Sequence, residues 1–164
     1  MILMTVGTQK FPFDRLLKKI DSLIEQEIIK DEVVAQIGYS DYRPVHYSYV
    51  DFIPEEKFDI LIQRSDILLT HGGIGTITKG LFLKKKVIII PRMKDFGEHI
   101  DNHQIEIGER FAVMGYALFC KNIEMISDTI EEASKRSFRE FHFSWCHVAK
   151  YIQSYLNQLE ENKI

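Results

Sequence analysis

Apolar residues in this chain gather in short runs that alternate with longer stretches of helical spacing. The apolar run at residues 2–6, which includes Thr5, closes at Gly7, and a run of this kind is typical of a buried strand. Residues 13–29 place apolar side chains three or four positions apart, which predicts a helix with Asp14 placed to cap it. By the same criteria the further predicted strands are 33–37, 47–52, 66–70, 86–90 and 113–119, and the further predicted helices are 54–64, 75–84, 98–111, 123–136 and 145–159.

The alternation of strands and helices predicts an α/β fold, a single Rossmann-like, doubly wound parallel sheet of about six strands. A length of 164 residues fits one domain, so we assign residues 1–164 to it. If the strand order is 3-2-1-4-5-6, it reverses between the first and fourth strands, and ligands bind at the carboxyl ends of strands beside such a reversal. The loops after these two strands are therefore the first candidates for a site.

Charge and cysteine content narrow the class of protein. The formal net charge of −3 argues against a nucleic-acid binder and against direct attachment to an anionic membrane. Cys120 and Cys146 form no CxxC pattern, which disfavours a disulfide framework or a zinc site and favours a reducing cytoplasm. No apolar run approaches 18 residues and the start lacks a basic region, so we expect neither a membrane span nor a signal peptide.

The stretch THGGIGTITKG, residues 70–80, lies where the fourth strand passes into a helix. Its glycines would let the backbone approach a ligand closely, and the helix would expose unpaired N–H groups at the positive end of its dipole. Such a turn suits a phosphate, and the loop at 7–10 begins with glycine at the same predicted edge. The glycines could instead serve only a tight turn and helix packing. Neither a Walker A motif nor GxGxxG after the first strand is found, which disfavours a P-loop or simple NAD site.

The segment 91–104 follows the fifth strand and contains several polar residues that suit sugar hydroxyls. These are Glu98, Asp101, Asn102 and Gln104. His99 and His103 lie four residues apart, on one face of the predicted helix, which invites a metal interpretation. No HExxH motif or obvious third ligand accompanies them, so ligand contact is preferred to a metal site. A capped helix with no ligand role is the remaining alternative.

Three segments of the sequence together resemble a known family. They are VGTQKFPFDRL at the start, SDILLTHGGIGTITKGL in the middle and KKVIIIPRMKDFGEHIDNHQIEIGERF after it. In this order and spacing they resemble the glycosyltransferase family 28 C-terminal domain, the nucleotide-sugar-binding half of GT-B glycosyltransferases, over roughly residues 1–120. The likeness is to the small subunits of two-component transferases. These include the subunits of bacterial exopolysaccharide and capsule synthesis and the eukaryotic subunit that adds the second N-acetylglucosamine to a dolichol-linked sugar.

The resemblance implies that both glycine loops and the segment after the fifth strand bind a UDP-sugar. The loop at 7–8 would face the diphosphate, residues 71–76 would hold phosphate through backbone N–H groups and the Thr76 hydroxyl, and residues 98–104 would reach the sugar. The implied donor-binding residues are Gly7, Thr8, His71, Gly72, Gly73, Gly75, Thr76, Glu98, His99, Asp101, Asn102 and Gln104. The resemblance implies no cofactor and no essential metal, because a helix terminus would stabilise the departing diphosphate.

Lys79 departs from the family pattern, since relatives commonly carry an acidic residue there that accepts hydrogen bonds from the ribose diol. A lysine offers donors only. Either Glu98 or Asp101 takes over the ribose, or the ribose is held weakly. Under the second hypothesis, which we prefer, Lys79→Glu is expected to tighten UDP binding about tenfold.

The resemblance implies the UDP-sugar-binding subunit of a two-component glycosyltransferase, a hexosyltransferase that serves surface polysaccharide synthesis and is active only with its partner. The partner would be a membrane-associated, acceptor-binding subunit that supplies the catalytic base, binds a lipid-linked saccharide and holds this chain at the inner face of the membrane. No catalytic residue is therefore assigned here, and no nucleic acid is expected. Two alternatives stay open: an accessory subunit without catalysis, and a free-standing sugar-phosphate enzyme with His71 or His99 as acid/base.

Residues 137–164 form a predicted C-terminal helical segment that is unusually rich in aromatic side chains. The aromatic residues concerned are Phe138, Phe141, Phe143, Trp145, Tyr151 and Tyr155. The segment either packs on the sheet as a last helix or docks the partner subunit, because aromatic side chains are enriched at interfaces.

Overall fold

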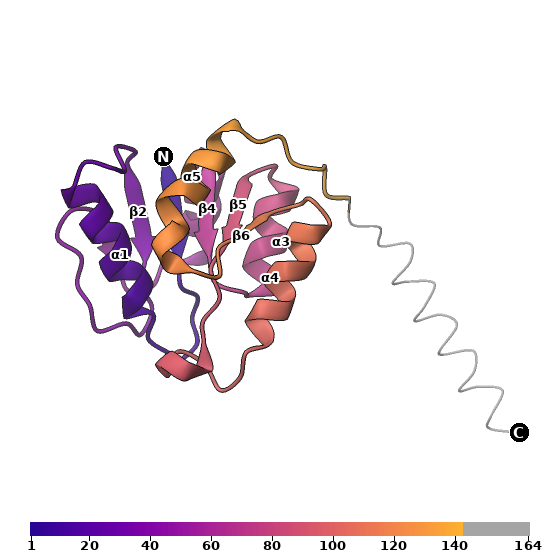
Figure 1. The fold of residues 1–164 in the computed structure, drawn as a ribbon. Helices are drawn as coiled ribbons and strands as arrows, with labels where there is room; N and C mark the ends of the chain where they lie inside the picture. The colour runs from indigo at the N-terminus through magenta and orange to yellow at the C-terminus, as the bar shows by residue number, and fades with distance from the viewer. Residues whose placement is uncertain (143–164) are drawn as a thin grey trace, which may run out of the picture.

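The computed structural model describes residues 1–142, which form one parallel sheet with helices on both faces (Figure 1). The strands are β1 (Ile2–Thr5), β2 (Val33–Gln36), β3 (Ser48–Val50), β4 (Ile67–Thr70), β5 (Lys86–Ile89) and β6 (Leu118–Phe119). Their order across the sheet is β3-β2-β1-β4-β5-β6, and every neighbouring pair is parallel. The predicted fold class and strand order are confirmed, and the order reverses between β1 and β4.

Helices bury both faces of this sheet. The helices are α1 (Asp14–Glu25), α2 (Glu55–Arg64), α3 (Ile74–Phe82), α4 (His103–Val113) and α5 (Ile126–Lys135), with short 3-10 turns η1 (Lys94–Phe96) and η2 (Ile123–Met125). Alternate residues of β1 face opposite layers: Met4 packs in the cluster with α1 and α5, whereas Leu3 packs in the cluster with α2 and α3. Two buried faces explain why three of the four residues of β1 are apolar, and Thr5 at its end is buried as well.

The helix predicted at 98–111 begins later, at His103. Gly97 adopts a left-handed φ of 68°, which ends the η1 turn, and the Asp101 carboxylate accepts a hydrogen bond from the His103 backbone N–H at the start of α4. His99 therefore precedes the helix, and the premise that His99 and His103 share a helix face is wrong.

Two other local predictions are also wrong in part. The strand predicted at 113–119 is confined to β6, because α4 continues to Val113 and Gly115 then turns the chain with a φ of 76°. Asp14 does not cap its own helix. Its carboxylate accepts hydrogen bonds from the backbone N–H groups of Asp41 and Tyr42, and so ties the loop after β2 to α1.

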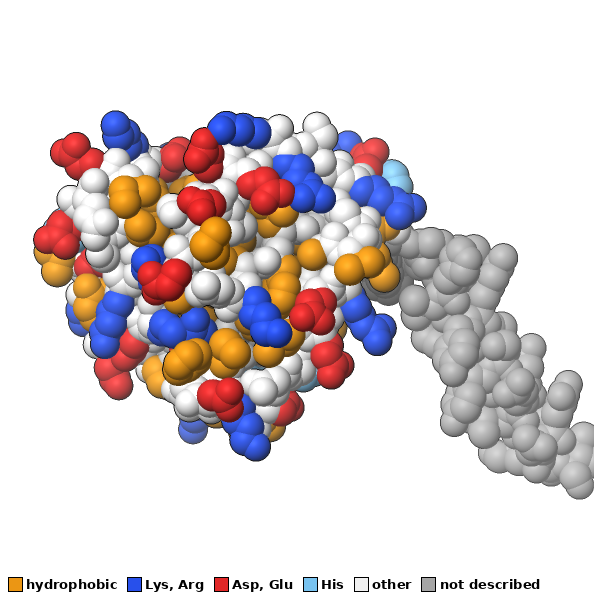
Figure 2. Space-filling model, in the orientation of Figure 1, with side chains coloured by type: hydrophobic (Ala, Val, Ile, Leu, Met, Phe, Trp, Pro, Cys, Tyr) orange, Lys and Arg blue, Asp and Glu red, His pale blue; other side chains and the backbone are white. Residues whose placement is uncertain are grey.

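The distribution of charged side chains on the surface is consistent with the modest net charge. On the described part of the face in Figure 2, Lys and Arg side chains are interspersed with Asp and Glu, and no continuous basic stripe crosses it. Within residues 1–142, no helix is both long and apolar enough to cross a membrane. Phe141 packs its ring against Phe82 and Tyr116, so the beginning of the 137–164 segment lies on the domain. The helix predicted at 145–159 and the aromatic residues from Phe143 onward lie outside the described residues.

Candidate functional site

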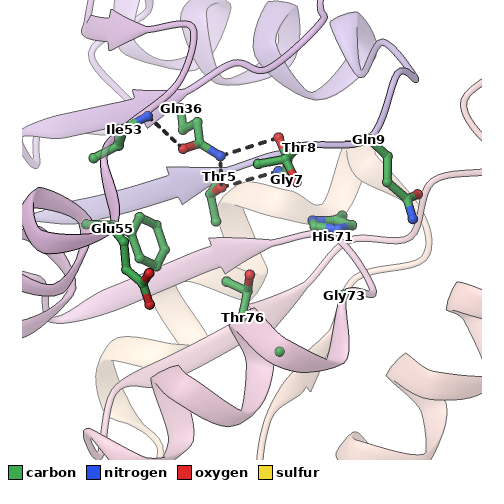
Figure 3. A pocket seen from close by; sticks show the side chains of 12 residues that line it. Thr5, Gly7, Thr8, Gln9, Gln36, Ile53, Glu55, His71, Gly73 and Thr76 are labelled. Carbon is green, nitrogen blue, oxygen red and sulfur yellow. Dashed lines mark hydrogen bonds between the residues drawn. The ribbon is translucent and has the colours of Figure 1, made fainter.

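A cavity of about 370 Å³ opens at the carboxyl edge of the sheet, where the strand order reverses (Figure 3). Its volume lies within the range of small-molecule sites in proteins. The lining residues come from the end of β1 and the loop after it, the end of β2, the loop before α2 and the start of α2, and the loop before α3 and the start of α3. They are Thr5, Gly7, Thr8, Gln9, Gln36, Ile53, Glu55, Phe58, His71, Gly73, Gly75 and Thr76. Half of the predicted donor-binding set is therefore brought together here: Gly7, Thr8, His71, Gly73, Gly75 and Thr76.

The His71 ring lies between the two glycine loops. A Cβ added at Gly73 would stand 2.6 Å from the ring Nε2, and a Cβ at Gly7 would come closer still to the ring Cε1. Gly7 also has a φ of 80°, a conformation that side chains disfavour. These two glycines are required by the imidazole, which explains why glycine and histidine occur together in this part of the sequence.

The electrostatic state of His71 follows from its burial. The residue is 8% exposed, and burial, with the positive charge of Arg92 next in size, lowers the pKa of the imidazole to about 4. The ring is neutral at neutral pH and so offers one N–H donor and one acceptor. A neutral imidazole is suited to binding a phosphate oxygen and poorly suited to acting as a general acid.

The N-terminus of α3 faces the same cavity and carries no side-chain cap. Gly73 is the N-cap residue, no acidic residue occupies the first turn, and Gly75 and Thr76 both line the cavity. The first N–H groups of a helix have no partner within the helix, and they carry the positive end of its dipole. This end of the cavity is therefore suited to an anion such as a phosphate.

Arg92 adds a buried positive charge behind these loops. Its side chain is fully buried, and one Nη2 hydrogen bond, to the carbonyl of Val6, holds the end of β1. Its Nε and Nη1 atoms have no hydrogen-bond partner among the described residues. Burial lowers the pKa of Arg92 to about 10, against the opposing influence of Glu98, so the guanidinium remains charged at neutral pH. It raises the positive potential around these loops, where they line the cavity.

Gln36 joins the segments that surround the cavity. Its side-chain amide donates to the Thr5 hydroxyl and to the carbonyl of Gly7, while its Oε1 accepts from the backbone N–H of Ile53 (Figure 3). Neither Gln36 nor Arg92 was assigned a role from the sequence. Each is a polar residue at or just beyond the carboxyl end of an apolar strand, and that position is the signal that could have identified both.

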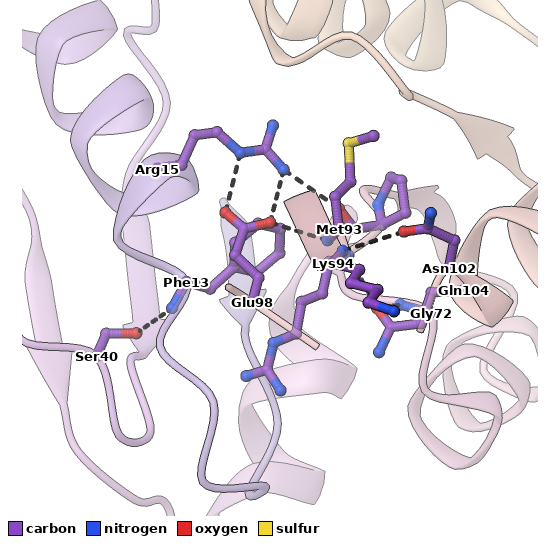
Figure 4. Close-up of polar contacts among 11 residues, drawn as sticks. Phe13, Arg15, Ser40, Gly72, Met93, Lys94, Glu98, Asn102 and Gln104 are labelled. Carbon is purple, nitrogen blue, oxygen red and sulfur yellow. Dashed lines mark hydrogen bonds and ion pairs between the residues drawn. The ribbon is translucent and has the colours of Figure 1, made fainter. Parts of the chain in front are cut away.

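The remaining predicted donor-binding residues lie outside this cavity, and most of them are engaged with protein partners (Figure 4). Glu98 is 4% exposed, and its carboxylate accepts hydrogen bonds from Nε and Nη2 of Arg15, both 2.9 Å long, and from the backbone N–H of Met93. The Arg15–Glu98 pair fastens the segment after β5 to α1. A sugar contact through Glu98 would have to break this buried pair.

Gln104 and Asn102 also have structural partners. The Gln104 Oε1 accepts from the backbone N–H groups of Gly72 and Arg92, so it joins the loops after β4 and β5. A Cβ at Gly72 would lie 2.5 Å from that of Gln104, so this glycine serves close packing. The Asn102 Oδ1 accepts from the backbone N–H of Lys94.

His99 and Asp101 contact each other in the segment between η1 and α4. The His99 Nδ1 lies 3.1 Å from the Asp101 Oδ1, and the His99 ring packs on Phe11 with ring centroids 5.2 Å apart. Among residues 1–142, no group of three or more His, Cys, Asp or Glu side chains is placed to hold a metal ion.

Lys79 is not among the residues that line the cavity. Its ammonium forms an ion pair with Asp59 on α2 and lies 5.6 Å from the centre of the Phe58 ring. Lys79 thus links α3 to α2. The expectation that Lys79 meets the ribose or the phosphate is not supported by this position.

Comparison with known proteins places these features in a family. The glycosyltransferase family 28 C-terminal domain matches residues 1–155. The UDP-N-acetylglucosamine transferase subunit ALG13 of Candida glabrata is 30% identical over 95 residues, which is 57% of this chain and 44% of that protein. The UDP-N-acetylglucosamine--N-acetylmuramyl-(pentapeptide) pyrophosphoryl-undecaprenol N-acetylglucosamine transferase of Prochlorococcus marinus is 25% identical over 128 residues, 76% of this chain and 33% of that protein. The chain therefore spans less than half the length of these curated relatives.

Solved structures show the same fold. A solution structure of ALG13 aligns with a TM-score of 0.59 and 18% identity, and the alignment covers 87% of this chain and 89% of that chain. The MurG structure from Acinetobacter baumannii aligns with a TM-score of 0.54 and 16% identity, and the alignment covers 93% of this chain but 49% of that chain. This chain thus has the architecture of about half of MurG.

Proposed function

Because this chain belongs to the glycosyltransferase family 28 C-terminal domain family, we propose that it is the UDP-sugar-binding component of a two-component glycosyltransferase. The observation that carries the proposal is the cavity at the strand-order reversal. There, two glycine loops, a neutral buried imidazole and an uncapped helix N-terminus meet around one space. Each of these groups is suited to a diphosphate, and together they account for half of the residues that the family resemblance implies.

The donor that we propose to test first is UDP-N-acetylglucosamine. Both curated relatives described above carry this nucleotide sugar or its transferred sugar in their names. The hexose donor and the role in capsule or exopolysaccharide synthesis remain predictions from the family resemblance. A lipid-linked acceptor is supported by the name of the Prochlorococcus marinus relative, which includes pyrophosphoryl-undecaprenol.

The reaction would be a direct displacement at the anomeric carbon of the donor sugar. The acceptor hydroxyl forms the new glycosidic bond while the bond to the diphosphate breaks, and a base on the partner takes the acceptor proton. Negative charge then grows on the departing diphosphate. The N–H groups at the start of α3 and the charge of Arg92 stabilise that developing charge from fixed positions.

The acceptor site is proposed to lie on a separate, membrane-associated subunit at the cytoplasmic face. Support comes from the curated ALG13 relatives, which are named as subunits of a transferase, and from the alignment of this domain with about half of MurG. We therefore expect the purified chain to bind the nucleotide without transferring sugar.

Two measurements test this proposal. Calorimetric titration with UDP, GDP and CMP should show saturable binding of UDP, and transfer from UDP-N-acetylglucosamine to a lipid diphosphate acceptor should appear only after a partner subunit is added. Failure of the folded chain to bind UDP or a UDP-sugar would favour the accessory-subunit alternative. Robust transfer by the chain alone would contradict the requirement for a partner.

A further inference from the structure

We propose that Glu55 recognises the nucleoside of the donor, its carboxylate accepting hydrogen bonds from the two adjacent hydroxyls of the ribose. The assignment rests on the proposed function and adds to it a specific residue and a direction of binding. Glu55 is the first residue of α2 and lines the cavity, in which its side chain and that of Thr76 project into the same space from α2 and α3 (Figure 3).

The Glu55 carboxylate is available for a ligand. Among residues 1–142 it makes no hydrogen bond or ion pair, and of the lining residues it is the sole charged one when His71 is neutral. Other carboxylates at this edge are occupied: Asp59 by Lys79, and Glu98 by Arg15. Glu98 and Asp101, the acceptors considered from the sequence, both lie outside the cavity lining.

The two ends of the cavity then differ in the ligand groups that they suit. A carboxylate repels phosphate and accepts hydrogen bonds only, so its natural ligand is a group with two neighbouring donors. The α3 end, with Gly75, Thr76 and the helix N–H groups, suits the diphosphate. Phe58 and Ile53 line the cavity with Glu55 and supply apolar surface for a nucleobase. The nucleoside therefore lies toward α2, and the diphosphate lies toward α3.

The position of Glu55 also admits a simpler explanation, in which an acidic residue stabilises the N-terminus of α2 through the helix dipole. Glu56 provides the matched control, because it also lies in the first turn of α2 and is exposed, but it does not line the cavity. An effect through the dipole would appear in both residues, whereas ribose recognition would appear in Glu55 alone.

The test is calorimetric titration of wild-type, Glu55→Gln and Glu56→Gln chains with UDP and with 2′-deoxy-UDP, after circular dichroism shows that each is folded. We expect the wild-type chain to prefer UDP by about tenfold, since each hydrogen bond to a charged group is strong. Glu55→Gln should bind UDP about tenfold more weakly and lose the preference, while Glu56→Gln keeps both. UDP carries no donor sugar, so a hexose diol cannot produce this result.

The direction of the change separates the possible outcomes. If the carboxylate only repels the diphosphate, Glu55→Gln binds UDP more tightly, and the assignment is wrong. Retention of the UDP preference in Glu55→Gln, or its equal loss in Glu56→Gln, also overturns it. A folded wild-type chain that binds no UDP contradicts the proposed function itself, and the assignment of Glu55 with it.

Discussion

The loops after β4 and β5 occupy comparable places in the fold but differ in what their polar groups do. Both follow central strands of the sheet, both lead into a helix, and both were predicted to bind the donor. In the loop after β4, the start of α3 is uncapped and opens into the cavity. In the segment after β5, Glu98, Asn102 and Gln104 are hydrogen-bonded to Arg15, Lys94, Gly72 and Arg92. We infer that the first loop binds the ligand, whereas the second builds the frame that holds it.

The largest effect should come from breaking the frame. Glu98→Ala leaves the Arg15 guanidinium without its carboxylate partner, in a pair whose side chains are 20% and 5% exposed. Loss of one partner of a buried pair is costly, and we expect the free energy of unfolding to fall by about 3 kcal/mol. Urea denaturation with an unchanged m-value measures this. Glu109→Gln is the exposed control, and an equal loss in both variants would contradict the structural role of Glu98.

A second large effect concerns pH and sharpens the role of His71. The native pKa of about 4 lies below the ordinary value of 6.5, so between these values the unfolded chain binds a proton that the native chain does not. The contribution of His71 is fully present above pH 6.5 and is lost as the pH falls toward 4. Its size is on the order of 3 kcal/mol.

The comparison of wild-type and His71→Asn chains isolates this contribution from other titrating groups. Chemical denaturation at several pH values between 4 and 7 should show a steeper loss of stability for the wild-type chain on acidification. Parallel curves for the two chains would show that the imidazole is not buried in its neutral form.

The two glycines of the α3 turn separate packing from ligand approach. Gly73→Ala would force its Cβ against the His71 ring and should destabilise the fold by about 1–3 kcal/mol. Gly75→Ala meets no protein atom within 4 Å and replaces a helical glycine, so it should stabilise the fold by up to about 1 kcal/mol. Gly75→Ala should nevertheless weaken UDP binding about tenfold if phosphate approaches this backbone. Unchanged UDP affinity in a folded Gly75→Ala chain would contradict the phosphate role.

The smallest effect is expected at Lys79. Its side chain is partly exposed and pairs with Asp59 outside the cavity, so Lys79→Met should change the free energy of unfolding by less than about 1 kcal/mol. We expect UDP affinity to change less than about threefold on the same grounds. A large loss of affinity, measured by calorimetry, would place the ammonium at the phosphates after all. The earlier expectation that Lys79→Glu tightens UDP binding is replaced by this one, since a glutamate there would face Asp59.

The sequence was sufficient to predict the elements that depend on local pattern. Apolar runs buried on both faces identified the central strands, and the glycine loops located the cavity edge. Contacts between distant segments could not be predicted in the same way. Arg15 meets Glu98 across 83 positions of sequence, and Gln36 joins Thr5 to Ile53 from a neighbouring strand. Nothing in the local composition around Glu98 distinguishes a carboxylate that faces a ligand from one that is paired with an arginine.

The difference between the two loops is tested most directly by amide chemical-shift mapping of the 15N-labelled chain during a titration with UDP. At 19.3 kDa the chain is small enough for residue-by-residue observation. The largest shift changes should occur at Gly7, Thr8 and residues 73–76, which surround the cavity, with small changes at residues 93–102. If the largest chemical-shift changes occurred in residues 93–102 while the signals of residues 73–76 stayed unchanged, the ligand would be bound by the segment after β5, which contradicts the roles inferred for the two loops.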